Sequence, residues 1–276
     1  MTIGEEFRQL HQPGNPFVLM NAYDIGSAKV MEALGAQAIG TSSSGHAFTL
    51  GRADMGNVSR DEALAHAQDL VEAVSVPVSG DFENGYGDNP EDVEETVRQA
   101  YEIGLAGCSI EDTNMADQSA YDFDLAVERI KAGAAAARGL AGDFVFVARA
   151  DGVMNRTYRM DEAIRRIKAF DDAGADCLYA PYLPDVLALK SVCEATAKPV
   201  NALAVGSFAK VPRSEFAKIG IARISLGSGI ARVTHGALIK TAREILNDGD
   251  FSSILEAAPS DNVEKLIVAG TSNQNV

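Results

Sequence analysis

Short β-branched runs alternate with helical patterns along this chain, and this alternation constrains its fold more than any other feature. Eight strand candidates occur between residues 16 and 226. Four of them follow a glycine that ends a helical pattern, where helices commonly stop, and lie within 34–40, 103–110, 173–179 and 219–226. The other four follow a polar or proline-containing turn, at 16–20, 76–78, 144–147 and 198–200.

Helical patterns fill the gaps between these runs. Ser59 and Glu62 have the spacing of a capping box, and Asn89 with Pro90 forms a second helix start. Further patterns lie at 26–34, 123–138, 161–173, 184–195, 213–218 and 229–246. Such alternation indicates a parallel sheet, and eight units close most economically as a single-domain (β/α)8 barrel of the TIM type. An open doubly wound sheet is the alternative, although no G-x-G-x-x-G follows a strand.

The length of 276 residues suits one large domain or two small ones, and no linker is long or polar enough to divide the chain. We therefore expect a catalytic barrel over residues 1–247. A helical extension and a polar, disordered tail are expected over 248–276. The segment 251–258 is expected to pack on another subunit.

Charge and cysteine content limit the partners and the compartment. The formal net charge of −15 argues against nucleic acid and anionic membranes as partners. The three cysteines are odd in number and lack metal-ligand spacing, which favours a reducing cytoplasm. Cys108, Cys177 and Cys193 lie inside predicted strands or helices, so we interpret them as small apolar fillers. No apolar stretch is long enough to span a bilayer, and residues 1–12 do not form a signal peptide.

Acidic side chains follow two of the predicted strands at once. Asp81 and Glu83 come after one apolar run, and Glu111 and Asp112 come after another. Because alternate residues of an extended segment point the same way, Asp81 and Glu83 project toward one site. Carboxylates at two strand ends suggest a site for a hard cation. The alternative is that these acids simply begin loops.

Catalytic groups of a TIM barrel lie at the carboxyl ends of its strands. Here those ends carry acids, one arginine and a Ser/Gly-rich loop, at 21–24, 41–46, 81–83, 111–112, 149–151, 180–182, 201–202 and 227–229. This set of residues amounts to a Mg²⁺ site beside a site for a carboxylate.

Five motifs in order carry a resemblance to a known family. They are Asn-Ala-Tyr-Asp-x-x-Ser-Ala at 21–28, Leu-Gly-Arg-Ala-Asp at 50–54, Asp-Phe-Glu-Asn-Gly-Tyr-Gly at 81–87, Ser-Ile-Glu-Asp at 109–112 and Ala-Arg-Ala-Asp at 148–151. The chain resembles the isocitrate lyase/phosphoenolpyruvate mutase superfamily over about residues 15–245. The resemblance implies a (β/α)8 barrel and a homo-oligomer, a tetramer or a dimer, with the last helix exchanged between subunits.

The resemblance also implies a role for each matched residue. Asp81 corresponds to the direct ligand of Mg²⁺, with Mn²⁺ as an alternative ion. Glu83 and Glu111 correspond to acids that hold the metal through water, and Asp54 to an acid supporting the metal's water shell. Arg149 corresponds to the arginine that grips the substrate carboxylate. The 2-oxo acid itself is held by the residues matching Ser42, Ser43 and Ser44, and Asn201 matches a polar position near the reacting end.

The loop after Glu111 and Asp112 departs from the best-known members. Lyases that cleave isocitrate or 2-methylisocitrate carry a Lys-x-Cys-Gly-His loop there, whereas the loop at 113–122 has neither Cys nor His. The Lys-rich loop of phosphoenolpyruvate mutase and phosphonopyruvate hydrolase is also absent. A third group, similar to oxaloacetate decarboxylases, needs no such loop, and the short loop favours a small substrate.

The sequence therefore predicts a cytoplasmic, Mg²⁺-dependent lyase. It would act on a small 2-oxo or 2-hydroxy di-acid through an enolpyruvate-like intermediate, by C–C cleavage or by oxaloacetate-type decarboxylation. Arg149 and Glu111 are the catalytic candidates, with His46 as a proton donor; the alternative for His46 is a hydrogen-bonded loop histidine. His11 and His66 are expected on the surface. The alternative functions are C–P chemistry on phosphonopyruvate and a weakly catalytic 2-oxo acid binding protein.

Overall fold

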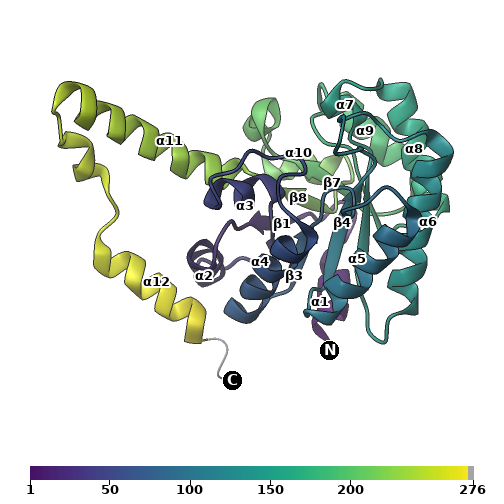
Figure 1. The fold of residues 1–276 in the computed structure, drawn as a ribbon, viewed down its shortest axis with the longest axis horizontal. Helices are drawn as coiled ribbons and strands as arrows, with labels where there is room; N and C mark the ends of the chain where they lie inside the picture. Colours follow the sequence, from purple (N-terminus) through teal and green to yellow (C-terminus); the bar gives the residue numbers. More distant parts are fainter. Residues whose placement is uncertain (273–276) are drawn as a thin grey trace.

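A computed structural model describes residues 1–272 and shows eight parallel strands closed into a barrel in the order β1 to β8 (Figure 1). The strands are β1 (Phe17–Asn21), β2 (Ile39–Gly40), β3 (Val78–Asp81), β4 (Gly107–Glu111), β5 (Val145–Arg149), β6 (Cys177–Tyr179), β7 (Val200–Leu203) and β8 (Arg223–Ser225). Closure is made where Phe17 of β1 pairs with Arg223 of β8. The barrel predicted from the alternation is confirmed, and the open sheet is excluded.

Helices surround the strands on the outside of the barrel (Figure 1). They are α1 (Ile3–Leu10), α2 (Ile25–Ala33), α3 (Ser43–Thr49), α4 (Arg60–Ala73), α5 (Pro90–Glu102), α6 (Phe123–Gly139), α7 (Gly152–Asn155), α8 (Met160–Asp172), α9 (Val186–Glu194), α10 (Arg213–Lys218), α11 (Gly229–Arg243) and α12 (Ser260–Ser272). Shorter turns are η1 (Gly206–Lys210), η2 (Glu244–Asp248) and η3 (Ser252–Glu256). The predicted starts at Ser59 and Asn89 are helix N-caps in capping boxes.

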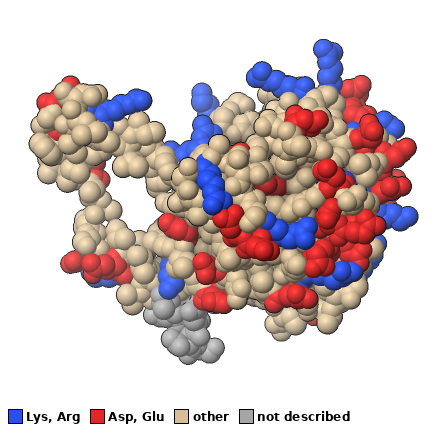
Figure 2. Space-filling model, in the orientation of Figure 1, with Lys and Arg blue, Asp and Glu red and all other residues tan. Residues whose placement is uncertain are grey.

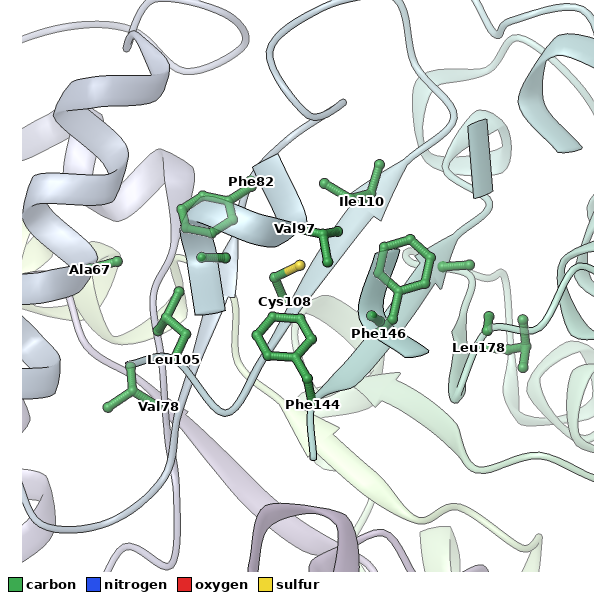
Figure 3. Close-up of a cluster of buried hydrophobic side chains, with 14 of the residues drawn as sticks. Ala67, Val78, Phe82, Val97, Leu105, Cys108, Ile110, Phe144, Phe146 and Leu178 are labelled. Atoms are coloured by element: carbon green, nitrogen blue, oxygen red, sulfur yellow. The ribbon is translucent and has the colours of Figure 1, made fainter. Parts of the chain in front are cut away.

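The main hydrophobic core lies between the outer faces of the strands and the helices. Figure 3 shows part of it, where Phe82, Phe144 and Phe146 surround Cys108 of β4. Cys108 and Cys177 are fully buried, and all three cysteines are free thiols. Burial raises the pKa of the Cys108 thiol, which keeps it protonated and unreactive. The interpretation of these cysteines as apolar fillers agrees with their positions.

Helix α1 closes the amino-terminal end of the barrel. Phe7 is fully buried in the inner core, where its ring meets those of His11 and Phe17 edge-on. The expectation that His11 lies on the surface is wrong, because α1 is a plug rather than a surface helix. Burial holds the pKa of His11 down at about 3, so the imidazole is neutral and packs as an aromatic ring.

Helix α11 leaves the barrel as an arm, and the chain returns through η2 and η3 to α12 (Figure 1). Helix α12 packs against α2, and Gly270 lies so close to Lys29 that a Cβ would come within 2.4 Å of the Lys29 carbonyl oxygen. The arm exposes large apolar side chains at Val233, Leu238, Ile239, Leu246, Phe251, Ile254 and Leu255. Exchange of the last helix and the domain boundary at 247/248 stay predictions. Of the predicted disordered tail, Thr271 and Ser272 belong to α12, and 273–276 lie outside the described residues.

Acidic side chains gather over α5 and α6 on the right of the view in Figure 2, as the net charge of −15 leads one to expect. Within residues 1–272, no helix combines the length and the apolar character that crossing a membrane requires.

The α1 plug generates a stability prediction. Phe7→Ala empties a fully buried aromatic site and is expected to lower the free energy of unfolding by about 3–5 kcal/mol, measured by urea denaturation. Leu187→Ala, at a position of α9 that is 74% exposed, is the matched control and should change it by less than about 0.5 kcal/mol. Equal stability of the two variants would contradict the plug.

Candidate active site

A cavity of about 720 Å³ opens at the carboxyl ends of the strands. The predicted site residues that line it are Ser42, Ser43, Ser44, Asp54, Asp81, Glu83, Glu111 and Arg149. This is the end at which a (β/α)8 barrel carries its chemistry. The structure therefore brings together eight residues that are spread over more than a hundred positions of the chain.

Asp81, the last residue of β3, stands at the centre of this group. Its Oδ2 accepts hydrogen bonds from the backbone N–H and the Oγ of Ser43, both at 3.0 Å. Its Oδ1 accepts from Nη1 of Arg149 at 2.6 Å. Ser109 Oγ lies 3.4 Å from the same oxygen. Strand β3 aims this carboxylate into the cavity because Asp81 pairs with Ser109 of β4 in the sheet.

Arg149 ends β5 and is surrounded by carboxylates. Its Nη2 lies 2.8 Å from Glu111 Oε2, and its Nε and Nη2 donate to the two oxygens of Asp151 at 3.2 and 2.5 Å. Glu111 and Arg149 are cross-strand partners in the β4–β5 pairing, which explains their closeness. Burial lowers the pKa of Arg149, but Asp151, Glu111 and Asp81 outweigh it and hold that pKa well above its ordinary value. Arg149 is therefore a permanent cation, and each of its three side-chain nitrogens contacts an acid.

Glu83 is held in a strained backbone conformation beside Asp81. Its φ of 43° lies in the left-handed region, which non-glycine residues seldom adopt. Its Oε1 accepts from the backbone N–H of Gly56 at 3.0 Å, while Oε2 is buried without a partner among the described residues. Burial raises the pKa of Glu83 to about 7. A buried carboxylate oxygen without a hydrogen-bond partner is suited to an external donor or a cation.

Asp54 and Glu111 complete the acidic group. Burial raises the pKa of Asp54, and a hydrogen bond from the Ser44 side chain partly opposes the shift. Burial also raises the pKa of Glu111 against the opposing charge of Arg149. Carboxylates are costly to bury as anions, so a cation in their midst would stabilise all of them.

Asp112 forms the base of the site rather than a wall of it. Its Oδ2 accepts from Tyr158 Oη at 2.7 Å and from Arg166 Nη1 at 3.0 Å, and its Oδ1 accepts from the backbone N–H of Asp151 at 2.8 Å. Burial raises its pKa to about 6. Asp112 thereby connects the end of β4 to the segment that holds Arg149.

The serines predicted to hold the substrate lie at the start of α3, a helix that the sequence pattern did not predict. Ser42 is its N-cap and accepts from the backbone N–H of Gly45 at 3.2 Å. Sequence reasoning treated this stretch as a loop because it consists of serines and a glycine, which are typical of turns. The helix aims the Ser43 N–H at Asp81, which is the geometry that its first turn favours.

Two predicted residues do not reach the cavity. His46 is buried and its ring stacks on His66 with the centroids 3.9 Å apart, so a role for His46 as proton donor has no geometric support. His66, expected on the surface, is half-buried in this stack. Asn201 is fully buried beneath the cavity, where it donates to Ser225 Oγ at 2.9 Å and accepts from Arg223 Nε at 2.8 Å. A direct contact of Asn201 with substrate is therefore unsupported.

Sequence reasoning did not single out Arg223, Tyr179 and Ser225. It included Asn21, Ser109 and Asp151 in strand ends or motifs but gave them no role. All six line or support the cavity. Asn21 joins β1 to its neighbours, since it donates to the Thr41 carbonyl and accepts from the N–H groups of Leu226 and Gly227. The two-residue period of the strands could have identified these residues, because a polar residue two positions before a strand end faces the same cavity as the end itself.

The donor set is suited to Mg²⁺, which prefers oxygen ligands and keeps several waters. Within the described part of the chain, no three His, Cys, Asp or Glu side chains are arranged to hold a metal ion directly. The direct role expected of Asp81 and the water-mediated roles expected of Glu83, Glu111 and Asp54 stay predictions. The orphaned Oε2 of Glu83 is suited to such a role.

Comparison with known proteins places the chain among lyases and mutases. The family model described as phosphoenolpyruvate phosphomutase matches residues 7–246. An uncharacterised protein of Mycobacterium tuberculosis (strain ATCC 25618 / H37Rv) is 33% identical, covering 84% of this chain and 87% of its own. The 2,3-dimethylmalate lyase of Eubacterium barkeri is 32% identical, covering 65% and 63%.

A solved structure agrees over nearly the whole chain. It is a Burkholderia cenocepacia J2315 protein of proposed lyase/mutase class, with a TM-score of 0.90 and 39% identity, covering 95% of this chain and 94% of that one. The likeness therefore includes the barrel and the C-terminal arm.

The pKa of Glu83 generates a prediction for the metal-free protein. Between pH 4.5 and about 7 the folded state keeps a proton that the unfolded state loses, so the contribution of Glu83 to stability falls as pH rises. Glu83→Gln removes this loss of stability, because the amide stays neutral at every pH. The variant should be more stable than wild type by about 1–3 kcal/mol at pH 8, and the difference should shrink toward pH 4.5.

The measurement is urea denaturation in EDTA at several pH values. Glu128→Gln, an exposed carboxylate of α6, is the matched control and should show no such trend. A constant difference between Glu83→Gln and wild type across the pH range would contradict the raised pKa.

Proposed function

The chain belongs to the phosphoenolpyruvate phosphomutase family, within the isocitrate lyase/phosphoenolpyruvate mutase superfamily, and on that premise we propose that it is a Mg²⁺-dependent lyase. Its substrate would be a small 2-oxo or 2-hydroxy di-acid. The bond to C3 would break to leave an enolpyruvate-like intermediate, by C–C cleavage or by decarboxylation of an oxaloacetate-type substrate.

The observation that carries the proposal is the convergence of Asp81, Glu83, Glu111 and Asp54 around Arg149 in one cavity. Four acids beside one arginine leave an excess of negative charge, which a bound Mg²⁺ would offset. When bound there, Mg²⁺ supplies a Lewis acid that stabilises the negative charge of an enolate. The protein residues would supply orientation and preorganised donors.

Arg149 is placed to change partners when substrate enters. Asp151 holds its Nε and Nη2 edge, and Asp151 is itself fully buried and fixed by its backbone bond to Asp112. The bond from Nη1 to Asp81 is the one that a substrate carboxylate would replace. The guanidinium then grips the substrate without changing its own position. Ser43 would keep Asp81 oriented through its N–H and hydroxyl.

The loop at 113–122 bears on which bond is broken. It is a compact turn in which Thr113 pairs with Ala120 and Asn155 Nδ2 donates to Thr113 Oγ1 at 2.9 Å. It carries no Cys, His or Lys, so it offers no thiol to protonate an enolate and no ammonium group for a phosphonate. The likeness to 2,3-dimethylmalate lyase supports C–C cleavage. C–P chemistry on phosphonopyruvate is the second candidate, because the family model is that of the phosphomutase.

A third candidate is a binding protein that keeps the metal site and has lost turnover. One experiment separates the three. Release of pyruvate or its homologues is measured by a dehydrogenase-coupled assay from 2-oxo acids, 2-hydroxy acids and phosphonopyruvate, with Mg²⁺ or with EDTA. Pyruvate kinase and ADP are added so that phosphoenolpyruvate is detected as well. Turnover of phosphonopyruvate alone would favour C–P chemistry. Calorimetric binding of 2-oxo acids without any turnover would favour the binder.

We expect Mg²⁺-dependent release from a di-acid, and Asp81→Ala should lower kcat/KM for it by about 10³-fold or more. Loss of the direct metal ligand removes stabilisation of the enolate, which is the physical reason. Asp172→Ala, an exposed carboxylate at the end of α8, is the matched control and should retain activity. Full Mg²⁺-dependent activity of Asp81→Ala would sink the assignment.

We further propose that the protein is a homo-oligomer, a tetramer or a dimer. The support is the arm, whose large apolar side chains, among them Leu238 and Leu246 at 63% and 81% exposure, are uncovered in one chain. A second copy of the chain would cover them. The three free thiols are in keeping with a reducing compartment, and a cytoplasmic location stays a prediction.

Light scattering after size exclusion should therefore give a multiple of the 29.1 kDa chain mass. Replacing both Leu238 and Leu246 by Asp should shift the protein toward monomer, because burying an unpaired carboxylate in an apolar interface is unfavourable. Leu187→Asp, on exposed α9, should not change the mass. A monomeric wild type at micromolar concentration would overturn the proposal.

A further inference from the structure

Arg223 is a buried cation on the wall of the cavity that the proposed chemistry does not use. It opens β8, whereas Asp81, Glu111 and Arg149 each end their strands, so Arg223 enters the cavity from a deeper level. Only 3% of its surface is exposed. Its alternate neighbour Ser225 also lines the cavity, which confirms that this face of β8 points inward.

Its hydrogen bonding is incomplete. Among the described residues, its one side-chain bond runs from Nε to Asn201 Oδ1, at 2.8 Å. Nη1 is buried and has no partner. Asn201 is in turn held by its bond to Ser225, so the Nε edge of the guanidinium is fixed and the far edge is left to donate.

An arginine that is buried with incomplete hydrogen bonding destabilises the folded state. Burial lowers the pKa of Arg223, and nearby Cys177, Tyr179 and Asp81 oppose the shift only in part; Asp81 forms its ion pair with Arg149 instead. A buried charge without a partner destabilises a protein by several kcal/mol, and such groups in native structures are usually met by a counter-ion or a ligand. The second buried arginine of the cavity, Arg149, differs because three carboxylates already engage it.

The side chains around Arg223 limit which kind of ligand group could bind it. Leu19 and Leu203 line the same part of the barrel and offer no hydrogen-bond acceptor in their side chains. An anionic group reaching this depth would find a cation fixed by Asn201, with the polar side chains of Ser225 and Tyr179 lining the same cavity. There a charge-assisted hydrogen bond is strong, and a neutral group of the same size would leave Nη1 unpaired.

We propose that Arg223 binds the distal carboxylate of the substrate and so selects di-acids over mono-acids, with Asn201 as the residue that positions it. This inference rests on the proposed function, in which Arg149 and the metal site take the 2-oxo carboxylate end. The two arginines would hold the two ends of one di-acid. Asn201, matched to a substrate-binding position by the resemblance, then acts through Arg223.

The test compares two ligands that differ in the distal carboxylate. Dissociation constants for 3,3-difluorooxaloacetate and pyruvate are measured by calorimetry with Mg²⁺, for wild type, Arg223→Met and Arg223→Lys. In Arg223→Met the preference for the di-acid should fall by about 10- to 100-fold, while pyruvate affinity changes by less than about threefold. Arg223→Lys should keep part of the preference, because it keeps the charge and loses the planar fork.

Arg138→Met, which removes an exposed arginine of α6, is the control for net charge and should leave both affinities unchanged. A crystal structure of wild type with the di-acid gives a readout that needs no variant, and should place the distal carboxylate within hydrogen-bond distance of Nη1. An unchanged preference in Arg223→Met, or an equal loss for both ligands, overturns the inference alone. Wild type that binds neither ligand overturns the proposed function and the inference with it.

Discussion

The arrangement of the cavity depends on the pairing of Arg149 with Asp81, Glu111 and Asp151. Three strand ends and one buried acid meet at a single guanidinium. Without this cation, the like charges of the acids would repel one another. The pair Glu111–Arg149 is set by the register of β4 and β5, so the closure of the barrel itself assembles the site.

The negative charge of the acids nevertheless exceeds the single positive charge of Arg149. Burial raises the pKa of Glu83, Glu111 and Asp54, and Glu83 has a free buried oxygen and a strained backbone. Such features are expensive in a protein that is only marginally stable, and they concentrate where a ligand relieves them. Arg223 is the reverse case, a buried cation with an unpaired Nη1 that lines the same cavity. A metal ion and a di-acid would together resolve both imbalances.

The features predicted from the sequence are those that depend on local pattern. Strand and helix alternation predicted the barrel, the capping boxes at Ser59 and Asn89 predicted two helix starts, and the acids after β3 and β4 predicted the cavity wall. Helices α3 and α7 escaped prediction because each is short and carries few apolar residues in a regular period. His11 was predicted on the surface because the short amphipathic pattern of α1 does not reveal that this helix plugs a barrel.

The sequence by itself determined the fold class, the order of the strand ends and the identity of the acids and of Arg149, because these follow from periodicity and from motifs a few residues long. Only the tertiary structure decided which side chains share a cavity. It moved His46 into a ring stack, moved Asn201 one layer below the site, and revealed Asp151 and Arg223 as its buried partners. The physical reason is that partnership across a barrel is set by register and depth, which relate residues about twenty to seventy positions apart and leave no mark on either local sequence.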